Sequence, residues 1–209
     1  MNAKNIVKAL RVYSTNVLDI ERMVVYAFVQ KEKIAYENSK LLSGYLSNLG
    51  DKLCEKSVDF FNNSKFDLSL DTLVEFFEQI IPENEKKEKG IVYTPREIKE
   101  YIVSCVCNAN TAPTVIDPSC GCGAFLVTAA QHIHKKYRLN YSDILSQKIY
   151  GIDIDDTAIR KAKILLALLA CTNQEYQDIS FNFICSNALD PKTVTKAKKW
   201  QPQGFDCVI

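Results

Sequence analysis

The chain has 209 residues, a formal net charge of +1 and 47% hydrophobic residues. This length suits two small structural units, the hydrophobic content supports a folded core, and the nearly neutral charge excludes a domain-wide basic surface. The lysines between residues 192 and 199 leave room for a local basic patch, although a solvated helix face is the simpler interpretation.

The eight cysteines do not resemble a disulfide framework, because several lie in apolar segments and no secretory leader is evident. We therefore expect a protein of the reducing cytoplasm. Two-residue spacings such as Cys105 to Cys107 place side chains on nearly opposite sides of a helix, which argues against a zinc site. The longest apolar run, residues 164–171, is too short to cross a bilayer, so no membrane segment is expected.

Helical periodicity characterises the N-terminal part of the chain. Apolar residues alternate at spacings of four and three over residues 6–27, which predicts one amphipathic helix that ends near Lys31. Its apolar seam either packs within a helical bundle or binds a partner in a coiled coil. Residues 41–49 and 68–81 show two further apolar faces. We expect residues 1–89 to form a helical N-terminal domain that ends in a charged linker.

From Gly90 onward, strand patterns alternate with helix patterns, which predicts an α/β fold with a parallel, Rossmann-like sheet over residues 90–209. The expected strands lie near residues 114–116, 149–152, 179–184 and 205–209, and the expected helices near residues 95–108, 123–138, 156–171 and 190–199. The first of these helices opens with Thr94-Pro95-Arg96-Glu97, a capping box with proline at the first helical position.

The segment Asp117-Pro-Ser-Cys-Gly-Cys-Gly123 follows the first predicted strand and precedes a helix. Gly121 and Gly123 allow a sharp bend and a close approach of a ligand to the backbone, next to the unpaired N–H groups of the helix start. Such turns bind NAD, FAD or S-adenosylmethionine. NAD fits less well, because Leu126 stands where a third glycine is expected and the acidic residue Asp153 follows too late.

Two further polar residues follow predicted strands. Asp153 ends the second strand, beside the first if the crossover is right-handed, and a carboxylate there can accept both hydroxyls of a ribose. Asp155 and Asp156 are better placed to cap the next helix, and Ile154 is expected against an adenine ring. Asn187 follows the third strand and either hydrogen-bonds an adenine edge or caps the following helix.

Four segments together resemble the ordered N-terminal motifs of adenine-N6 DNA methyltransferases of restriction-modification systems. They are Gly90-Ile-Val-Tyr93-Thr94-Pro95, Asp117 to Phe125, Gly151-Ile-Asp153, and Phe205-Asp-Cys-Val-Ile209. The resemblance implies S-adenosylmethionine as cofactor, bound by a methyltransferase-type sheet. Departures are Cys122, where the family often has serine, and Asn187, where an acidic residue is common. The expected cofactor-binding residues are Tyr93, Thr94, Pro95, Asp117, Ser119, Gly121, Gly123, Asp153, Ile154 and Asn187.

The resemblance also implies a reaction in which adenine is flipped out of double-stranded DNA and an Asn-Pro-Pro-Tyr-like motif directs its amino group at the methyl donor. That motif would begin just after Ile209, so we expect an N-terminal fragment whose sheet stops after the fourth strand and which is inactive alone. The expected partners are double-stranded DNA, bound through the full-length protein, and a specificity or restriction subunit. A noncatalytic cofactor-binding or assembly module is the alternative function, and methylation of protein glutamine or RNA is a third.

Overall fold

The computed structural model describes residues 3–80 and 94–209. The chain divides into two compact units, residues 1–93 and 94–209. Within the described residues, no helix has the length and apolar character that a bilayer crossing requires.

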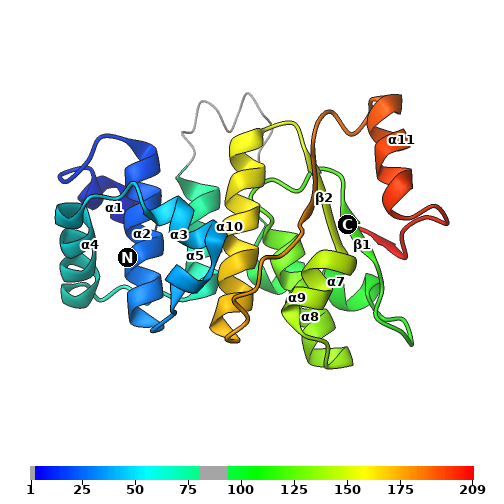
Figure 1. Cartoon of the computed structure of the whole chain (residues 1–209), viewed down its shortest axis with the longest axis horizontal. Helices are drawn as coiled ribbons and strands as arrows, with labels where there is room; N and C mark the ends of the chain where they lie inside the picture. Colours follow the sequence, from blue (N-terminus) through cyan, green and yellow to red (C-terminus); the bar gives the residue numbers. More distant parts are fainter. Residues whose placement is uncertain (1–2, 81–93) are drawn as a thin grey trace. The chain divides into compact units, whose positions relative to one another are not determined.

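The first unit is helical throughout its described part. Its elements are α1 (Ala3–Leu10), α2 (Val17–Lys31), the 3-10 helix η1 (Tyr36–Asn38), α3 (Lys40–Leu46), α4 (Asp51–Asn63) and α5 (Leu70–Gln79) (Figure 1). α2 packs against α4 and also contacts α3 and α5, while α1 contacts α5. The side chains of Ile6, Met23, Phe28, Phe76 and Phe77 are almost completely buried, so burial of apolar surface holds this bundle together.

The single amphipathic helix predicted for residues 6–31 is wrong, because the chain leaves the helix after Leu10 and re-enters it at Val17. The side-chain oxygen of Asn16 accepts a hydrogen bond of 2.9 Å from the backbone N–H of Leu18, which makes Asn16 the cap of α2. Tyr13 and Val17, two members of the predicted seam, are 40% and 38% exposed. The remaining seam residues are buried inside the helical unit, as expected for an intramolecular bundle.

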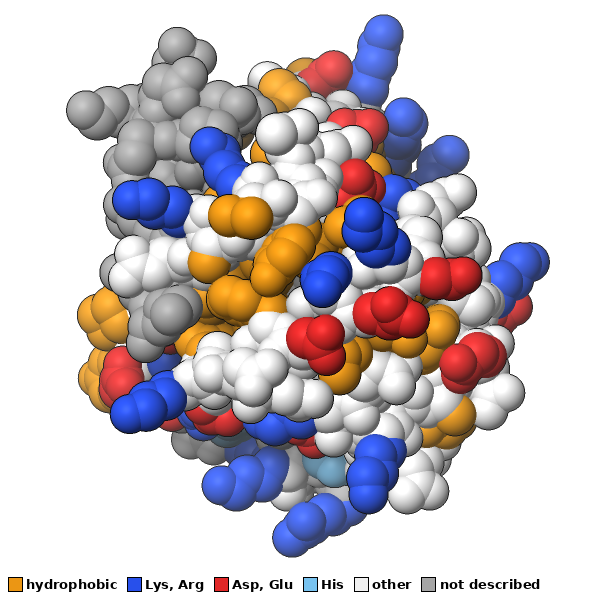
Figure 2. Space-filling model, turned by 90° about the vertical axis from the view of Figure 1, so that its left-hand side faces the viewer, with side chains coloured by type: hydrophobic (Ala, Val, Ile, Leu, Met, Phe, Trp, Pro, Cys, Tyr) orange, Lys and Arg blue, Asp and Glu red, His pale blue; other side chains and the backbone are white. Residues whose placement is uncertain are grey.

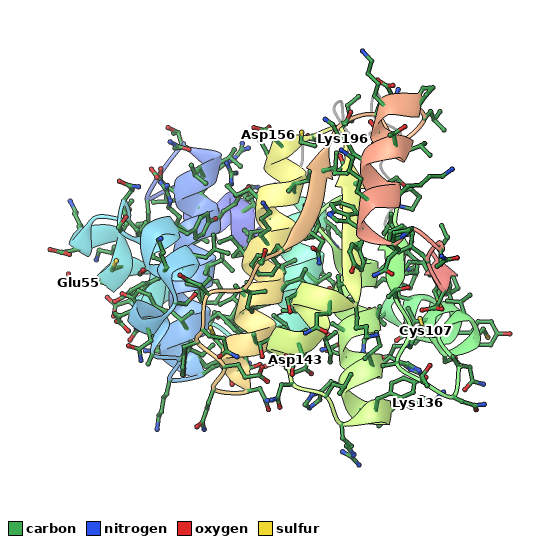
Figure 3. All side chains as sticks on the ribbon, turned by 45° about the vertical axis from the view of Figure 1, so that its right-hand side comes forward. Glu55, Cys107, Lys136, Asp143, Asp156 and Lys196 are labelled. Carbon is green, nitrogen blue, oxygen red and sulfur yellow. The ribbon has the colours of Figure 1, made fainter. Side chains whose placement is uncertain are left out.

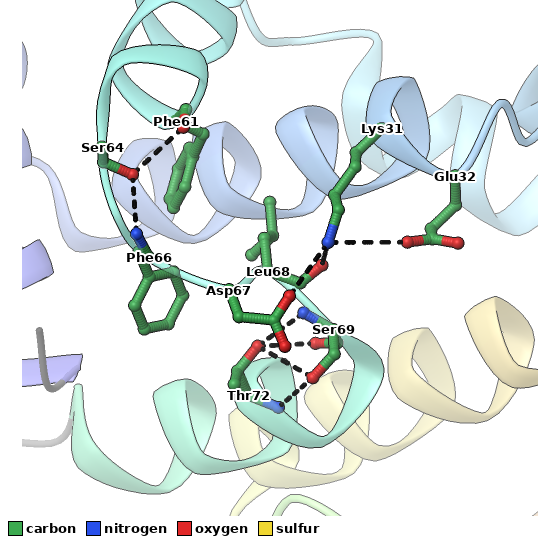
Figure 4. A network of polar contacts seen from close by, with 9 residues as sticks. All are labelled: Lys31, Glu32, Phe61, Ser64, Phe66, Asp67, Leu68, Ser69 and Thr72. Atoms are coloured by element: carbon green, nitrogen blue, oxygen red, sulfur yellow. Dashed lines mark hydrogen bonds and ion pairs between the residues drawn. The ribbon is translucent and has the colours of Figure 1, made fainter.

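A network of polar contacts joins the end of α2 to the start of α5 (Figure 4). Nζ of Lys31 donates to the carbonyl oxygen of Leu68 over 2.8 Å and to Oδ1 of Asp67 over 3.1 Å. Ser69 and Thr72 form a reciprocal capping box, in which each side chain accepts from the other's backbone N–H. A cap of this kind contributes about 1 kcal/mol to helix stability. The hydrogen bonds between Ser69 and Thr72 therefore favour the start of α5 at this point.

The second unit contains a parallel four-stranded sheet with strand order β3-β2-β1-β4. Its elements are α7 (Arg96–Val106), β1 (Val115–Asp117), α8 (Ala124–Tyr137), α9 (Tyr141–Gln147), β2 (Ile149–Asp153), α10 (Asp156–Thr172), β3 (Asn182–Cys185), α11 (Pro191–Trp200) and β4 (Cys207–Val208). The predicted α/β class is confirmed. The helix α9 was not predicted, and β3 and β4 are shorter than expected.

Helices cover both faces of this sheet. The connections from β1 to β2 and from β2 to β3 run in one direction across the sheet, so right-handed crossovers place α8 and α10 on the same face. The return from β3 to β4 places α11 on the opposite face (Figure 1). There, Ala197 packs against Ile116, Tyr150 and Ile152. Since all strands are parallel, the segments that follow β1, β2 and β3 meet at one edge of the sheet.

Candidate functional site

The turn after β1 is built by its two predicted glycines. Gly121 and Gly123 have φ angles of +52° and +84°, in a backbone region that residues other than glycine rarely adopt. The N–H of Cys120 donates to the carbonyl oxygen of Ile152 over 2.9 Å, which attaches the turn to β2. A Cβ atom on Gly123 would lie 2.8 Å from Cβ of Ala162, so only glycine lets α8 begin this close to α10.

Asp153, at the end of β2, is hydrogen-bonded to the glycine turn. Its Oδ2 accepts from the N–H of Gly121 over 2.8 Å, and its Oδ1 accepts from the N–H of Asp155 over 2.8 Å. A carboxylate has about four lone-pair sites, so both oxygens keep acceptor capacity for a ligand. Asp155 itself caps α10 through the N–H of Thr157, as predicted.

Asp117 is the buried carboxyl group of the site, with 5% of its surface exposed. Its Oδ1 accepts from the N–H of Ser119 over 2.9 Å, while Ser119 is itself exposed. Burial raises the pKa of Asp117 to about 6, and the negative charge of Asp153 adds to the increase. A buried carboxylate of this kind favours a ligand group that is positively charged or donates a hydrogen bond.

Two large apolar side chains stand exposed in the segments that follow β2 and β3. Ile154 is 74% exposed and Leu189 is 88% exposed. Ile154 was predicted to be a site residue from the sequence, and Leu189 was not. The available signal for Leu189 was a large apolar residue two positions after the polar residue Asn187, in the segment that follows β3. Both side chains offer apolar surface that a planar ring could cover.

Asn187 does not cap α11, so that alternative is wrong. The cap is Asp190, whose Oδ1 accepts from the N–H of Lys192 over 2.8 Å. Oδ1 of Asn187 instead accepts from the N–H of Leu189 over 2.9 Å, within its own turn. Among the described residues, no hydrogen bond uses the side-chain N–H groups of Asn187.

The upstream motif is placed only in part. Tyr93 lies outside the described residues. α7 begins at Arg96, with Pro95 as a cap residue that makes no side-chain hydrogen bond, so the predicted capping box at Thr94 is wrong. In the described part of the chain, no hydrogen bond joins Thr94 or Pro95 to the glycine turn.

A cavity of about 790 Å³ lies in the helical unit and was not predicted. The rings of Tyr26 and Tyr36 line it, with centroids 6.2 Å apart, and Asp51 and Glu55 are among its acidic lining residues. Figure 2, viewed from the side on which α4 lies, shows exposed apolar side chains with both acidic and basic side chains around them. Glu55 is marked in Figure 3. This cavity shares no residue with the glycine turn.

The parallel sheet, the glycine turn after β1 and the carboxylate after β2 define a doubly wound α/β protein, a class whose ligands lie at the carboxyl edge of the strands. The chain belongs to the N-6 DNA methylase family, whose model matches residues 68–209. This match confirms the family that the motifs resemble. It begins at Leu68, upstream of the Gly90 at which the motif resemblance starts.

Three known proteins illustrate the relationship. Over 120 residues the chain is 28% identical to the methylase subunit of the type I restriction enzyme EcoEI from Escherichia coli, covering 56% of this chain and 22% of that protein. It is 27% identical over 160 residues to the type II restriction enzyme and methyltransferase RM.BcgI from Heyndrickxia coagulans, covering 71% of this chain and 24% of that protein. A chain in the cryo-EM structure of the DrdV–DNA complex is similar with a TM-score of 0.49 and 12% identity, covering 87% of this chain and 22% of that chain. The chain therefore spans less than a quarter of the length of these relatives.

Proposed function

We propose that these residues bind S-adenosylmethionine as part of an enzyme that transfers its methyl group to the N6 amino group of adenine in DNA. The hydrogen bond between Gly121 and Asp153 carries this proposal, because it joins the glycine turn after β1 to a carboxylate at the end of β2, the position from which such folds bind ribose hydroxyls. Membership of the N-6 DNA methylase family supports the choice of methyl donor and base.

The residues present suit the cofactor. A Cβ atom on Gly121 would meet no heavy atom within 4 Å, so open space lies beside the backbone of the turn. Asp153 has acceptor capacity for two ribose hydroxyls, and the buried carboxylate of Asp117 suits the positively charged methionine part. When bound, the cofactor supplies an electrophilic methyl group. Ser119 and the upstream Tyr93, Thr94 and Pro95 complete the methionine end in this proposal.

The adenine of the cofactor is assigned to the space between the segments that follow β2 and β3. Ile154 and Leu189 provide exposed apolar surface there. Asn187 keeps its amide N–H groups, which can donate to a ring nitrogen. In this proposal the two apolar side chains contact the ring of the adenine and Asn187 contacts its edge.

The wider assignment concerns the whole protein. We propose that it acts on double-stranded DNA in the cytoplasm, within a restriction-modification system that can include a specificity or restriction subunit. Residues 1–89 form its helical N-terminal domain and linker, and residues 90–209 the cofactor-binding half of the methyltransferase domain. The 209 residues contain no Asn-Pro-Pro-Tyr segment, so we expect them to bind the cofactor without transferring its methyl group in isolation.

Methyl transfer by the intact protein tests this function. Unmethylated duplex DNA is incubated with the protein and S-adenosylmethionine labelled with tritium in the methyl group, and the DNA is then digested to nucleosides. Radioactivity in N6-methyladenine is the expected result. Label confined to a methylated cytosine, to RNA or to protein, or no transfer at all, would contradict the assignment.

A further inference from the structure

Helix α11 carries a row of lysines on one flank. Lys192, Lys196 and Lys199 are exposed and follow one another at spacings of four and three residues, so they lie on one side of the helix. Lys196 is marked on this helix in Figure 3. The helix contains no acidic residue. Within the described part of the chain, none of the three lysines takes part in an ion pair.

The other side of α11 is anchored to the sheet. Thr193 and Ala197 are buried, and the ring of Trp200 lies 5.3 Å from that of Tyr150 in the sheet. Oγ1 of Thr193 donates to Oγ of Ser186, just after β3, over 2.8 Å. These contacts hold the helix in one orientation, so the lysine row projects from a fixed base.

The lysine row begins beside the candidate cofactor site. Asn187 and Leu189 belong to the segment that immediately precedes α11, and Asp190 caps the helix. The first lysine, Lys192, therefore follows Leu189, which is assigned to the adenine pocket, by three positions in the sequence. A nucleic acid bound at the carboxyl edge of the sheet would meet this row first at Lys192, because α11 begins at that edge and runs back toward the start of β4.

We propose that Lys192, Lys196 and Lys199 bind the phosphodiester backbone of duplex DNA and help to position it at the site. This inference rests on the proposed function. The helical rise between successive lysines is roughly 6 Å and 4.5 Å, which lets separate side chains reach successive phosphates. A protein partner is the weaker fit, because protein interfaces are depleted in lysine and enriched in aromatic residues, whereas this flank carries lysine and Thr195.

The test measures binding of the 209-residue chain to a fluorescent 30-base-pair duplex by anisotropy, over a range of salt concentrations. The triple variant Lys192→Gln, Lys196→Gln, Lys199→Gln is compared with a charge-matched control, Lys40→Gln, Lys52→Gln, Lys65→Gln, in the helical unit. Loss of three phosphate contacts is expected to reduce the slope of log affinity against log salt by about 2.7. The control is expected to leave the slope nearly unchanged. Lys198→Gln, on another side of α11, provides a single-site comparison.

Calorimetric binding of S-adenosylmethionine to each variant separates this inference from the proposed function. If the triple variant loses DNA affinity while keeping cofactor affinity and its circular dichroism, the lysine row is the DNA contact. The inference is overturned if both triple variants weaken DNA binding equally, if neither does, or if the unaltered chain shows no salt-dependent binding. Failure of the unaltered chain to bind cofactor would instead count against the proposed function.

Discussion

The backbone N–H of Gly121 donates a hydrogen bond of 2.8 Å to Oδ2 of Asp153. Thirty-two positions apart in sequence, the two residues meet because β1 and β2 are parallel neighbours whose ends share one edge of the sheet. Asp153 therefore holds the glycine turn in place in addition to its assigned contact with a ribose. A residue with both tasks affects stability and binding together, and suitable controls can separate the two effects.

Asp153→Asn is expected to destabilise the α/β unit by roughly 1–3 kcal/mol, because one of the two backbone N–H groups would then face an amide NH₂ group. The measurement is urea unfolding followed by the fluorescence of Trp200, the single tryptophan, which packs in this unit. Asp156→Asn, on an exposed aspartate three positions further on, is the control and should change stability by less than about 0.5 kcal/mol. Equal effects of the two substitutions would contradict the bridging role.

Gly123→Ala is expected to destabilise the same unit by roughly 2–4 kcal/mol, because strain at positive φ adds to the overlap with Ala162. Gly121→Ala is the matched comparison, since it has positive φ but open space around the new Cβ. Gly121→Ala should lower the free energy of unfolding only by the strain of positive φ, roughly 1–2 kcal/mol.

The overlap can be relieved from the other side. Ala162→Gly combined with Gly123→Ala should recover part of the stability lost in Gly123→Ala alone, although Ala162→Gly by itself destabilises α10. Urea unfolding of the four proteins completes a double-mutant cycle. Strictly additive effects would show that Gly123 and Ala162 do not restrict one another.

The raised pKa of Asp117 predicts that the free energy of unfolding depends on pH. Burial raises its pKa to about 6 from an ordinary value of 3.8, so the folded state holds this proton more tightly than the unfolded state. The stabilisation from that proton is complete below pH 3.8 and is lost as the pH rises through 6. By 1.36 kcal/mol per pKa unit, the loss attributable to Asp117 is at most about 3 kcal/mol.

Asp117→Asn isolates this contribution from the other carboxyl groups. Its side-chain oxygen can still accept from the N–H of Ser119, and the group no longer titrates. The free energy of unfolding of the variant minus that of the unaltered chain should increase between pH 4 and pH 7. Urea titrations at four pH values provide the measurement, and a constant difference across this range would rule out the raised pKa.

Ile154→Ser and Leu189→Ser should each weaken S-adenosylmethionine binding by roughly threefold to tenfold, because the cofactor's adenine would lose apolar contact area. Both side chains are exposed, so the stability of the chain should change little. Val12→Ser removes an 82% exposed apolar side chain in the helical unit and should alter neither property. Cofactor affinity unchanged in both site variants would remove these residues from the adenine pocket.

The sheet, the glycine turn and the α10 cap at Asp155 could be predicted because their signals are local: apolar runs, paired glycines and an aspartate before a helix. The helix α9 could not be predicted in this way. Glu175 accepts hydrogen bonds from the N–H groups of Tyr141 and Ser142 at its start, over 3.0 and 2.7 Å. A cap supplied from that far along the chain leaves no mark in the nearby sequence.

Two wrong predictions, the unbroken helix across the residues after Leu10 and Asn187 as the cap of α11, have another origin. Ser14 and Asn16 are local stop and start signals, but the regular apolar spacing across them suggested one helix. Asn187 and Asp190 are both able to cap α11, and only the backbone geometry shows that Asp190 does so. In the site, the same geometry reveals the exposure of Leu189, which depends on how the loop before α11 folds.

Binding of S-adenosylmethionine through Asp153 is tested most directly by calorimetric titration of the cofactor into the 209-residue chain, with Asp153→Ala and Asp156→Ala in parallel. We expect one cofactor bound per chain, affinity reduced at least about tenfold in Asp153→Ala by loss of the carboxylate, and affinity nearly unchanged in Asp156→Ala. Folded Asp153→Ala with the affinity of the unaltered chain, or no heat of binding from the unaltered chain, would contradict binding through Asp153.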